Sequence, residues 1–416
     1  MHPFTLIFLA ALLLSSLARL WLAGRQVRHV IAHRDTVPAD FAAKVSLADH
    51  RKAADYTAAK TRLGMLNVLV ETAVVLAFTL GGGLQALSDF WLGLLDGPYS
   101  RGLALIGSVV VISSLADLPL SLYRTFRIEA RFGFNKMTPG LFLGDLAKQV
   151  LLAILFGAPL VLCVLWLMGR MGDYWWLYVW LTWMGFNLLV LAIYPTFIAP
   201  FFNKFSPLED QALKARIEKL LAACDFQAKG LFVMDGSKRS SHGNAYFTGF
   251  GRNRRIVLFD TLLQRLDNDE IEAVLAHELG HFKLRHIIKR IALMFGLSLG
   301  FLALLGWLID NPWFYAGLGV STQSTAMALV LFFLVMPAFI FPFEPLFSLY
   351  SRKHEFEADD YAARHASAPH LAQALVKLYQ DNAATLTPDP LYSSFHDSHP
   401  AAVQRVANLQ KVANAA

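Results

Sequence analysis

Residues 149–168 read QVLLAILFGAPLVLCVLWLM, a run of 20 residues without a charged side chain. A helix of about 20 apolar residues is long enough to cross the roughly 30 Å hydrocarbon core of a bilayer. Six other stretches have the same character, so the candidate spans are about 4–22, 65–84, 103–123, 149–168, 174–199, 291–309 and 325–347. The sequence therefore predicts a mainly α-helical membrane protein with seven transmembrane helices.

The composition of the 416 residues agrees with this prediction. Hydrophobic residues make up 56% of the chain and charged residues only 16%, against about 25% charged residues in ordinary soluble domains. A single water-soluble globule, a disordered chain and a collagen are thereby excluded. The two cysteines, Cys163 and Cys224, are too few for a disulfide framework. The net charge of +6 is explained better by membrane topology than by a nucleic-acid partner.

The basic residues are distributed unevenly between the spans. The segments 23–64, 124–148, 200–290 and 348–416 hold 34 of the 37 lysines and arginines, and they alternate along the chain. Cytoplasmic segments carry such an excess, so we expect an outer N-terminus and a cytoplasmic C-terminus. The first run could instead be a cleaved signal peptide, but it lacks a basic n-region and must span for the alternation to hold.

Two of the basic segments are long enough to fold outside the bilayer. Residues 208–226 have helical spacing, residues 231–234, 244–248 and 256–259 resemble short strands, and Asp267 with Glu270 marks a helix start. We expect a small cytoplasmic α+β domain that two spans interrupt in sequence. The predicted division is 1–199 for spans one to five, 200–290 for the first part of this domain, 291–347 for spans six and seven, and 348–416 for its second part.

The residues His277-Glu278-Leu279-Gly280-His281 carry the clearest chemical signal. Two histidines four positions apart project from one helical face and can share a tetrahedral Zn²⁺. Zinc lowers the pKa of a bound water toward about 7, so Glu278 can act as general base while the oxygen attacks a carbonyl carbon. The pattern predicts peptide-bond hydrolysis with one zinc ion per chain. The alternative is a helix with two surface histidines.

The stretch Ser351 to Asp360, SRKHEFEADD, offers the third ligand that such a pair needs. On a helix Glu355 and Asp359 share one face, so we expect Glu355 to bind the ion and Asp359 to accept the ring N–H of a ligand histidine, with His277 the first choice. Glu357 points to the opposite face and is expected to be a solvated charge. His354 is the rival third ligand, although it points away from the face of Glu355.

The C-terminal part contains His396-Asp397-Ser398-His399-Pro400 and then Arg405. A metalloprotease needs a donor aimed at the oxyanion that forms on the carbonyl oxygen, and a late histidine or arginine could supply it. From spacing alone, a loop histidine and a surface arginine are equally good interpretations.

Together these motifs resemble the CAAX prenyl protease 1 family, seven-span membrane zinc endopeptidases of the gluzincin type. The resemblance begins at Phe132-Gly133-Phe134-Asn135-Lys136 and ends at Arg405. It also includes Tyr194 to Pro200, Phe205 to Leu208, Asn244 to Phe247 and both zinc motifs. It departs from the family at Ala401, where family members often have proline, and in a C-terminus without a lysine-rich tail. The second departure makes a bacterial plasma membrane a better expectation than the endoplasmic reticulum.

The resemblance implies a role for each site residue. Zinc would bind His277, His281 and Glu355, with Glu278 as general base, and His399 and Arg405 would line the cleft and assist substrate binding or oxyanion stabilisation. The residues Asn244, Ala245, Tyr246 and Phe247 would be an open edge strand for the substrate. The spans would surround a water-filled chamber that the catalytic domain caps. Polar residues in the spans, Glu71, Asp117, Asn187 and Glu344, would face this chamber or pair between helices.

The sequence thus predicts an integral membrane zinc metalloendopeptidase that cuts near the cytoplasmic face. Its expected partners are the lipid bilayer and a peptide or protein substrate, and removal of the C-terminal tripeptide from prenylated CAAX proteins is the reaction that the resemblance implies. A quality-control protease for misfolded membrane proteins is the alternative among enzymes. A transporter or receptor with a vestigial metal site is the alternative from another class, but a complete ligand set with an intact base argues against it.

Overall fold

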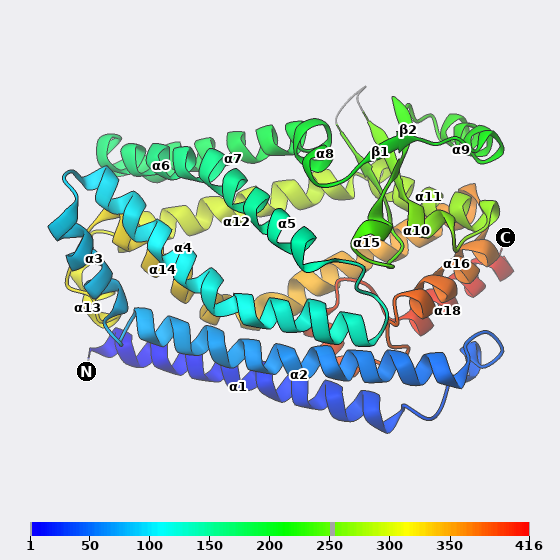
Figure 1. The fold of residues 1–416 in the computed structure, drawn as a ribbon, viewed down its shortest axis with the longest axis horizontal. Helices are drawn as coiled ribbons and strands as arrows, with labels where there is room; N and C mark the ends of the chain where they lie inside the picture. Colours follow the sequence, from blue (N-terminus) through cyan, green and yellow to red (C-terminus); the bar gives the residue numbers. More distant parts are fainter. Residues whose placement is uncertain (1, 250–253, 416) are drawn as a thin grey trace.

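The computed structural model describes residues 2–249 and 254–415. The described chain is mostly helical and forms an elongated molecule (Figure 1). A four-stranded sheet and the helices around it lie at one end, and the N-terminus lies at the other.

Seven helices in the described part of the chain are long and apolar enough to span a membrane, which confirms the predicted number. They are Pro3–Ala32, Leu47–Phe78, Pro98–Glu129, Pro139–Arg170, Gly172–Phe202, His286–Leu308 and Thr325–His365. The predicted end of the second span at residue 84 is wrong, because the helix stops at Phe78. Gly82 there has φ 78°, a left-handed conformation that turns the chain into the short helix α3 (Gly83–Leu94).

Three spans are single helices: α1 (Pro3–Ala32), α2 (Leu47–Phe78) and α12 (His286–Leu308). The other four spans are built from consecutive helical segments. The composite ones are α4 with η2 (Pro98–Tyr123, Arg124–Glu129), α5, η3 and α6 (Pro139–Leu152, Ala153–Gly157, Ala158–Arg170), η4, α7, η5 and α8 (Gly172–Tyr174, Trp175–Ile193, Tyr194–Ile198, Ala199–Phe202), and α14, η8 and α15 (Thr325–Ile340, Phe341–Phe343, Glu344–His365). The predicted boundary at 347 therefore falls inside α15, which continues the last span.

Large apolar side chains point outward along these helices, including Leu14, Leu143, Phe197 and Phe333. Such exposure is expected where the surrounding solvent is lipid rather than water. Among the polar residues in the spans, Glu71 pairs with Arg19 of α1 at 3.0 Å, which is the interhelical arrangement. Asn187 donates to the Trp183 carbonyl in its own helix.

The sheet at the end of the molecule has the strand order β1-β2-β4-β3. The strands are β1 (Phe205–Pro207), β2 (Gly230–Met234), β3 (Ala245–Thr248) and β4 (Arg255–Phe259), and β2 pairs parallel with β4 while the outer pairs are antiparallel. The three predicted strands and the helix before them, α9 (Gln211–Ala223), are confirmed. β1 was not predicted, because its three residues are too few to show alternation.

The apolar core of this end is formed by the sheet, by α9 and by helices from both predicted parts of the domain. Those helices are α10 (Asp260–Leu263), α11 (Asn268–Lys283), α16 (Ala368–Asp381) and α18 (Ala402–Ala415). Of the remaining short helices, α17 (Pro390–His396) directly precedes α18, and α13 (Pro312–Gly317) lies at the opposite end of the molecule. Buried Ile217, Leu258, Leu275 and Leu371 belong to one cluster. The two parts of the domain therefore share a single core.

Two cavities with mixed polar and apolar linings lie between the spans and this domain. One of about 990 Å³ is lined by α1, α2 and the segment after α17, and one of about 700 Å³ is lined by α11, α12 and α15. Both cavities are lined by Asn244, His396 and His399. The predicted chamber therefore corresponds to two adjoining cavities, and Glu344 lines the smaller one.

Candidate metal centre and active site

α11 presents the HELGH motif to the smaller cavity. Asp267 caps this helix and forms a capping box with Glu270, which confirms the predicted helix start. The four-residue spacing then brings His277 Nε2 to 3.2 Å from His281 Nε2. The two rings come from one face of one helix, as the sequence predicts.

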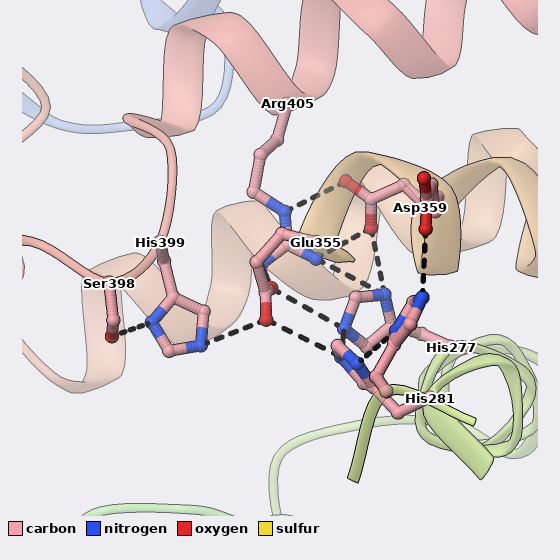
Figure 2. Close-up of polar contacts among 9 residues, drawn as sticks. His277, His281, Glu355, Asp359, Ser398, His399 and Arg405 are labelled. Carbon is pink, nitrogen blue, oxygen red and sulfur yellow. Dashed lines mark hydrogen bonds and ion pairs between the residues drawn. The ribbon is translucent and has the colours of Figure 1, made fainter. Parts of the chain in front are cut away.

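α15 crosses α11 closely at Gly280, the fourth residue of the motif. A Cβ atom at Gly280 would lie 3.1 Å from the Cα of Ala358 and 3.1 Å from the Cβ of Tyr361. Glycine therefore allows the backbones of the two helices to approach each other. This approach brings Glu355 of α15 to the two histidines of α11 (Figure 2).

The spacing of the three side chains fits one metal ion. Glu355 Oε1 lies 3.4 Å from His281 Nε2, and Glu355 Oε2 lies 3.6 Å from His277 Nε2. Ligand atoms at about 2.1 Å from a tetrahedral ion lie about 3.4 Å apart, so the three observed separations match a shared ion. Glu355 Oε2 is also buried without a hydrogen-bond partner in the described structure, with the Arg405 guanidinium 3.4 Å away, so a metal ion would complete its surroundings.

Asp359 supports His277 from behind. Its Oδ1 lies 2.9 Å from His277 Nδ1, and its side chain is completely buried. Burial opposes protonation of His277, but hydrogen bonds to Asp359 and Glu355 outweigh burial and raise the pKa of His277 to about 9. The contact between Asp359 and His277 is the one expected from the sequence, and it leaves Nε2 facing the candidate metal position.

Arg405 approaches the same carboxylates rather than the open side of the cleft. Its Nε and one terminal nitrogen donate to Asp359 at 2.9 and 2.6 Å, and the other terminal nitrogen lies 3.4 Å from Glu355. The side chain is buried, and Figure 2 shows it above Glu355 and Asp359. Its position beside the cavity agrees with the resemblance, but its donors face protein carboxylates.

Glu278 and His399 face the cavity around the candidate metal position. Burial raises the pKa of Glu278, whose carboxylate makes no hydrogen bond or ion pair with any described residue. His399 Nε2 lies 3.5 Å from Glu355, and its other ring nitrogen lies 3.0 Å from the Ser398 hydroxyl (Figure 2). Desolvation within the cavity lowers the pKa of His399, although its side chain remains exposed to the cavity, and this favours the neutral ring.

The strand Ala245–Thr248 is β3, at the edge of the sheet, and within the described residues it pairs only with β4. Asn244 precedes it and lines both cavities, and Ala245 lines the smaller one. Phe247 packs into the core against Phe226 and Phe282, whereas Tyr246 lies on the other face of the sheet and contacts Phe259. Phe247 can therefore offer a substrate its backbone rather than its side chain.

The rival ligand His354 lies away from the three candidate ligands and stacks on His286. Glu357 is partly exposed, as expected for a surface charge, but its Oε2 also lies 2.9 Å from Nε2 of the buried His286. The sequence analysis missed His286. A histidine five residues after the HELGH motif was the available signal, but periodicity could not place it.

Comparisons with known proteins agree with this architecture. Residues 26–204 match the family described as CAAX prenyl protease N-terminal, five membrane helices, and residues 207–413 match peptidase family M48. The chain is 42% identical to the CAAX prenyl protease 1 homolog of Oryza sativa subsp. japonica, over 74% of this chain and 73% of that protein. It is 34% identical to the CAAX prenyl protease 1 homolog of Homo sapiens, over 97% and 95% of the two chains. The crystal structure of S. mikatae Ste24p superimposes with a TM-score of 0.92 at 31% identity, covering 98% of this chain and 99% of that one.

Proposed function

The chain belongs to peptidase family M48 as a membrane metalloprotease that resembles the CAAX prenyl proteases, and on this premise we propose that it is a zinc endopeptidase. The proposed ligands are His277, His281 and Glu355. The observation that carries this proposal is the set of separations of 3.2, 3.4 and 3.6 Å among their nitrogen and oxygen atoms. Two histidines and one glutamate with an open fourth position are typical of catalytic rather than structural zinc sites.

Each residue around the ion would have its own role in hydrolysis. The ion, when bound, supplies a Lewis acid that polarises the scissile carbonyl and makes water a stronger nucleophile. Glu278 accepts a proton from the attacking water and delivers it to the leaving amine. Neutral His399 can donate to the oxygen that becomes negative, because it borders the same cavity as Glu278. Asp359 and Arg405 hold the ligands in place.

We propose that the substrate is a peptide or protein with a prenylated C-terminus, as the names of the relatives indicate for those proteins. The peptide backbone would pair with the free edge of β3, and Asn244 would hold a substrate carbonyl. Support comes from Asn244 and His399, which line both cavities and so border the passage between them. A peptide extended along β3 could thus occupy both cavities with its scissile bond beside Glu278.

Substitution of the general base tests the proposed function. The Glu278→Gln variant keeps the ligand set, so it should retain one zinc ion per chain, while kcat should fall by about 10²–10⁴-fold. Zinc content and cleavage of a prenylated CAAX peptide are measured on the same purified protein, with the unprenylated peptide as matched substrate. Wild-type activity in the variant would remove Glu278 from the mechanism. Progressive digestion of an unfolded membrane protein, instead of a single cut in the prenylated peptide, would favour quality control.

We also propose that the end of the molecule with the sheet is cytoplasmic, in a bacterial plasma membrane. The four basic segments support this orientation, because cytoplasmic segments carry the excess of lysine and arginine. Single cysteines introduced at Asp173 or Lys411, in a background in which Cys163 and Cys224 are both replaced by alanine, test it. A membrane-impermeant maleimide should label the Asp173→Cys variant in intact cells and the Lys411→Cys variant only after permeabilisation, and the reverse pattern would invert the topology.

A further inference from the structure

The outer nitrogen of His281 contacts a second histidine instead of a carboxylate. His281 Nδ1 lies 3.0 Å from Nδ1 of His286, the first residue of α12. The other ring nitrogen of His286 lies 2.9 Å from Glu357 Oε2. His281 is thus connected to a carboxylate of α15 through His286, whereas His277 contacts Asp359 of the same helix directly.

The direction of these hydrogen bonds follows from the chemistry of the groups. The Glu357 carboxylate only accepts, so His286 carries its proton on Nε2 and donates it. A neutral His286 ring then has a lone pair on Nδ1, which accepts the proton of His281 Nδ1. His281 Nε2 is consequently left unprotonated, and this is the atom that lies 3.4 Å from Glu355 and 3.2 Å from His277.

The position of the His286 ring is fixed by its surroundings. His354 stacks on it with ring centroids 4.0 Å apart and an angle of 8° between the planes, and Tyr350 packs edge-on against His354 at 4.3 Å. Arg285 immediately before it adopts φ 60°, a left-handed conformation that directs the chain from α11 into α12. This conformation is energetically unfavourable for a residue other than glycine, so contacts with the surrounding structure must stabilise the turn.

The same residues could be taken for a second metal site, because donor atoms of His286, His354 and Glu357 lie within 4.8 Å of one another. The stacking argues against this interpretation. Imidazole lone pairs lie in the plane of the ring, so two nearly parallel stacked rings cannot both direct a lone pair at one ion. Both nitrogens of His286 are, moreover, already within hydrogen-bond distance of partners.

We propose that His286 and Glu357 are positioning residues that hold His281 in the tautomer able to bind the metal ion. This inference rests on the proposed zinc site. Three carboxylates at every second position of α15 would then have different roles. Glu355 binds the ion, Asp359 orients His277, and Glu357 orients His281 through His286. Outer partners of ligand histidines fix the tautomer and typically contribute about 10- to 100-fold to metal affinity.

The test compares two substitutions of His286 with one of its neighbour. His286→Phe keeps a flat ring for stacking but removes the acceptor, whereas His286→Asn keeps an oxygen near the position of Nδ1. His354→Phe is the matched control, because it places the same new ring in the same stack without contacting a ligand. Full-length zinc-loaded protein in detergent is mixed with a chromogenic chelator, and the rate of zinc release is recorded together with the Co²⁺ absorption spectrum of the substituted protein.

We expect His286→Phe to release zinc about 10- to 100-fold faster than wild type and to alter the Co²⁺ spectrum, while His286→Asn and His354→Phe stay within a few-fold of wild type. Glu357→Leu should also accelerate release, and it replaces His286→Phe as the test if that variant does not fold. Wild-type rates of zinc release in both His286→Phe and Glu357→Leu would overturn the proposal. A zinc content of two ions per wild-type chain that falls to one in His354→Phe would also overturn it, because it would show a second metal site. Wild-type protein that binds no zinc would instead overturn the proposed function.

Discussion

Arg405 is the residue whose environment differs most from its expected role. Its guanidinium donates two hydrogen bonds to buried Asp359 and contacts Glu355. Burial lowers the pKa of Arg405, but the two carboxylates outweigh burial and raise it, so the side chain stays charged. Two of its five N–H donors are thus used on Asp359, and the nitrogen that approaches Glu355 also faces a protein carboxylate. His399, with one ring nitrogen 3.5 Å from Glu355 and its side chain largely exposed in the cavity, is better placed to donate to an oxyanion.

Exchange of each residue for alanine should separate the two roles. Arg405→Ala leaves the Asp359 carboxylate buried without its cation, so the free energy of unfolding should fall by about 3–5 kcal/mol and bound zinc should decrease. His399→Ala should keep zinc and stability, while kcat falls by about 10²-fold. Thermal unfolding in detergent, zinc analysis and peptide cleavage are measured on both variants. An Arg405→Ala enzyme with full zinc and wild-type stability but low kcat would assign the oxyanion role to Arg405.

The raised pKa of His277 predicts that zinc binding releases a proton. In the metal-free protein this pKa is about 9, because Asp359 and Glu355 stabilise the protonated ring. A ligand histidine must be neutral, so at pH 7.5 binding should displace close to one proton from His277, and this number should fall toward zero as the pH rises above 9. Calorimetric titrations of metal-free protein in buffers of different ionisation enthalpy measure the number. A value near zero at pH 7.5 would contradict the prediction.

At the scale of elements, the crossing of α11 and α15 determines whether the three candidate ligands meet. Gly280→Ala adds a methyl group 3.1 Å from the Ala358 Cα, so the helices must separate by a few tenths of an ångström. Overpacking of this kind costs about 1–3 kcal/mol, although alanine by itself favours a helix by about 1 kcal/mol over glycine. Glu355 should move with α15, and both zinc affinity and activity should fall.

Gly296→Ala in α12 is the matched control, because an added Cβ at Gly296 has no atom within 4 Å. It should gain the helix preference of alanine without displacing a neighbour, leaving zinc affinity unchanged. The comparison is made by zinc titration and thermal unfolding of the two variants. Equal zinc affinity in both would show that the close approach at Gly280 does not control the site.

Features that are determined within one segment could be predicted from the sequence, and contacts between segments could not. Membrane spans, the capped helix at Asp267 and the pair Glu355 and Asp359 depend on local composition or on helical periodicity, and these were predictable. The contact of His286 with His281 depends on a left-handed turn at Arg285, a residue type that does not favour it. The inward packing of Phe247 likewise depends on Phe226 and Phe282 from other elements. Periodicity within one segment contains no information about such contacts.

At the scale of the whole molecule, the first span is connected to the segment that carries His399. Arg25 of α1 donates to Asp389 at 3.0 and 3.3 Å, and the side chain of Gln26 accepts from the Asp389 backbone at 2.7 Å. Asp389 is buried and caps α17, which leads directly to the His399 segment. The membrane part and the catalytic part are thus joined by contacts between residues more than 360 positions apart.

The Arg25 contact predicts a specific sensitivity to acid. Burial raises the pKa of Asp389, but the hydrogen bonds from Arg25 and from the Tyr392 backbone outweigh burial and lower it. The Arg25 contact therefore stabilises the protein above the unfolded-state pKa and is lost as the pH falls through the folded-state pKa. Without Arg25 the folded-state pKa of Asp389 should rise, so the loss should begin at higher pH. Arg25→Gln should therefore lower the free energy of unfolding by about 1–2 kcal/mol at pH 7, a value reduced by the partial exposure of Arg25.

Arg28→Gln provides the control for this substitution, since Arg28 lies one turn further along α1, is exposed and forms no hydrogen bond or ion pair with a described residue. Both variants lose one positive charge from the same helix, so a general effect of charge would appear in both. The measurement is the midpoint of acid unfolding in detergent. It should move to higher pH in Arg25→Gln alone, because only there does the buried Asp389 carboxylate lose its guanidinium partner. An equal shift in the two variants would assign the effect to net charge.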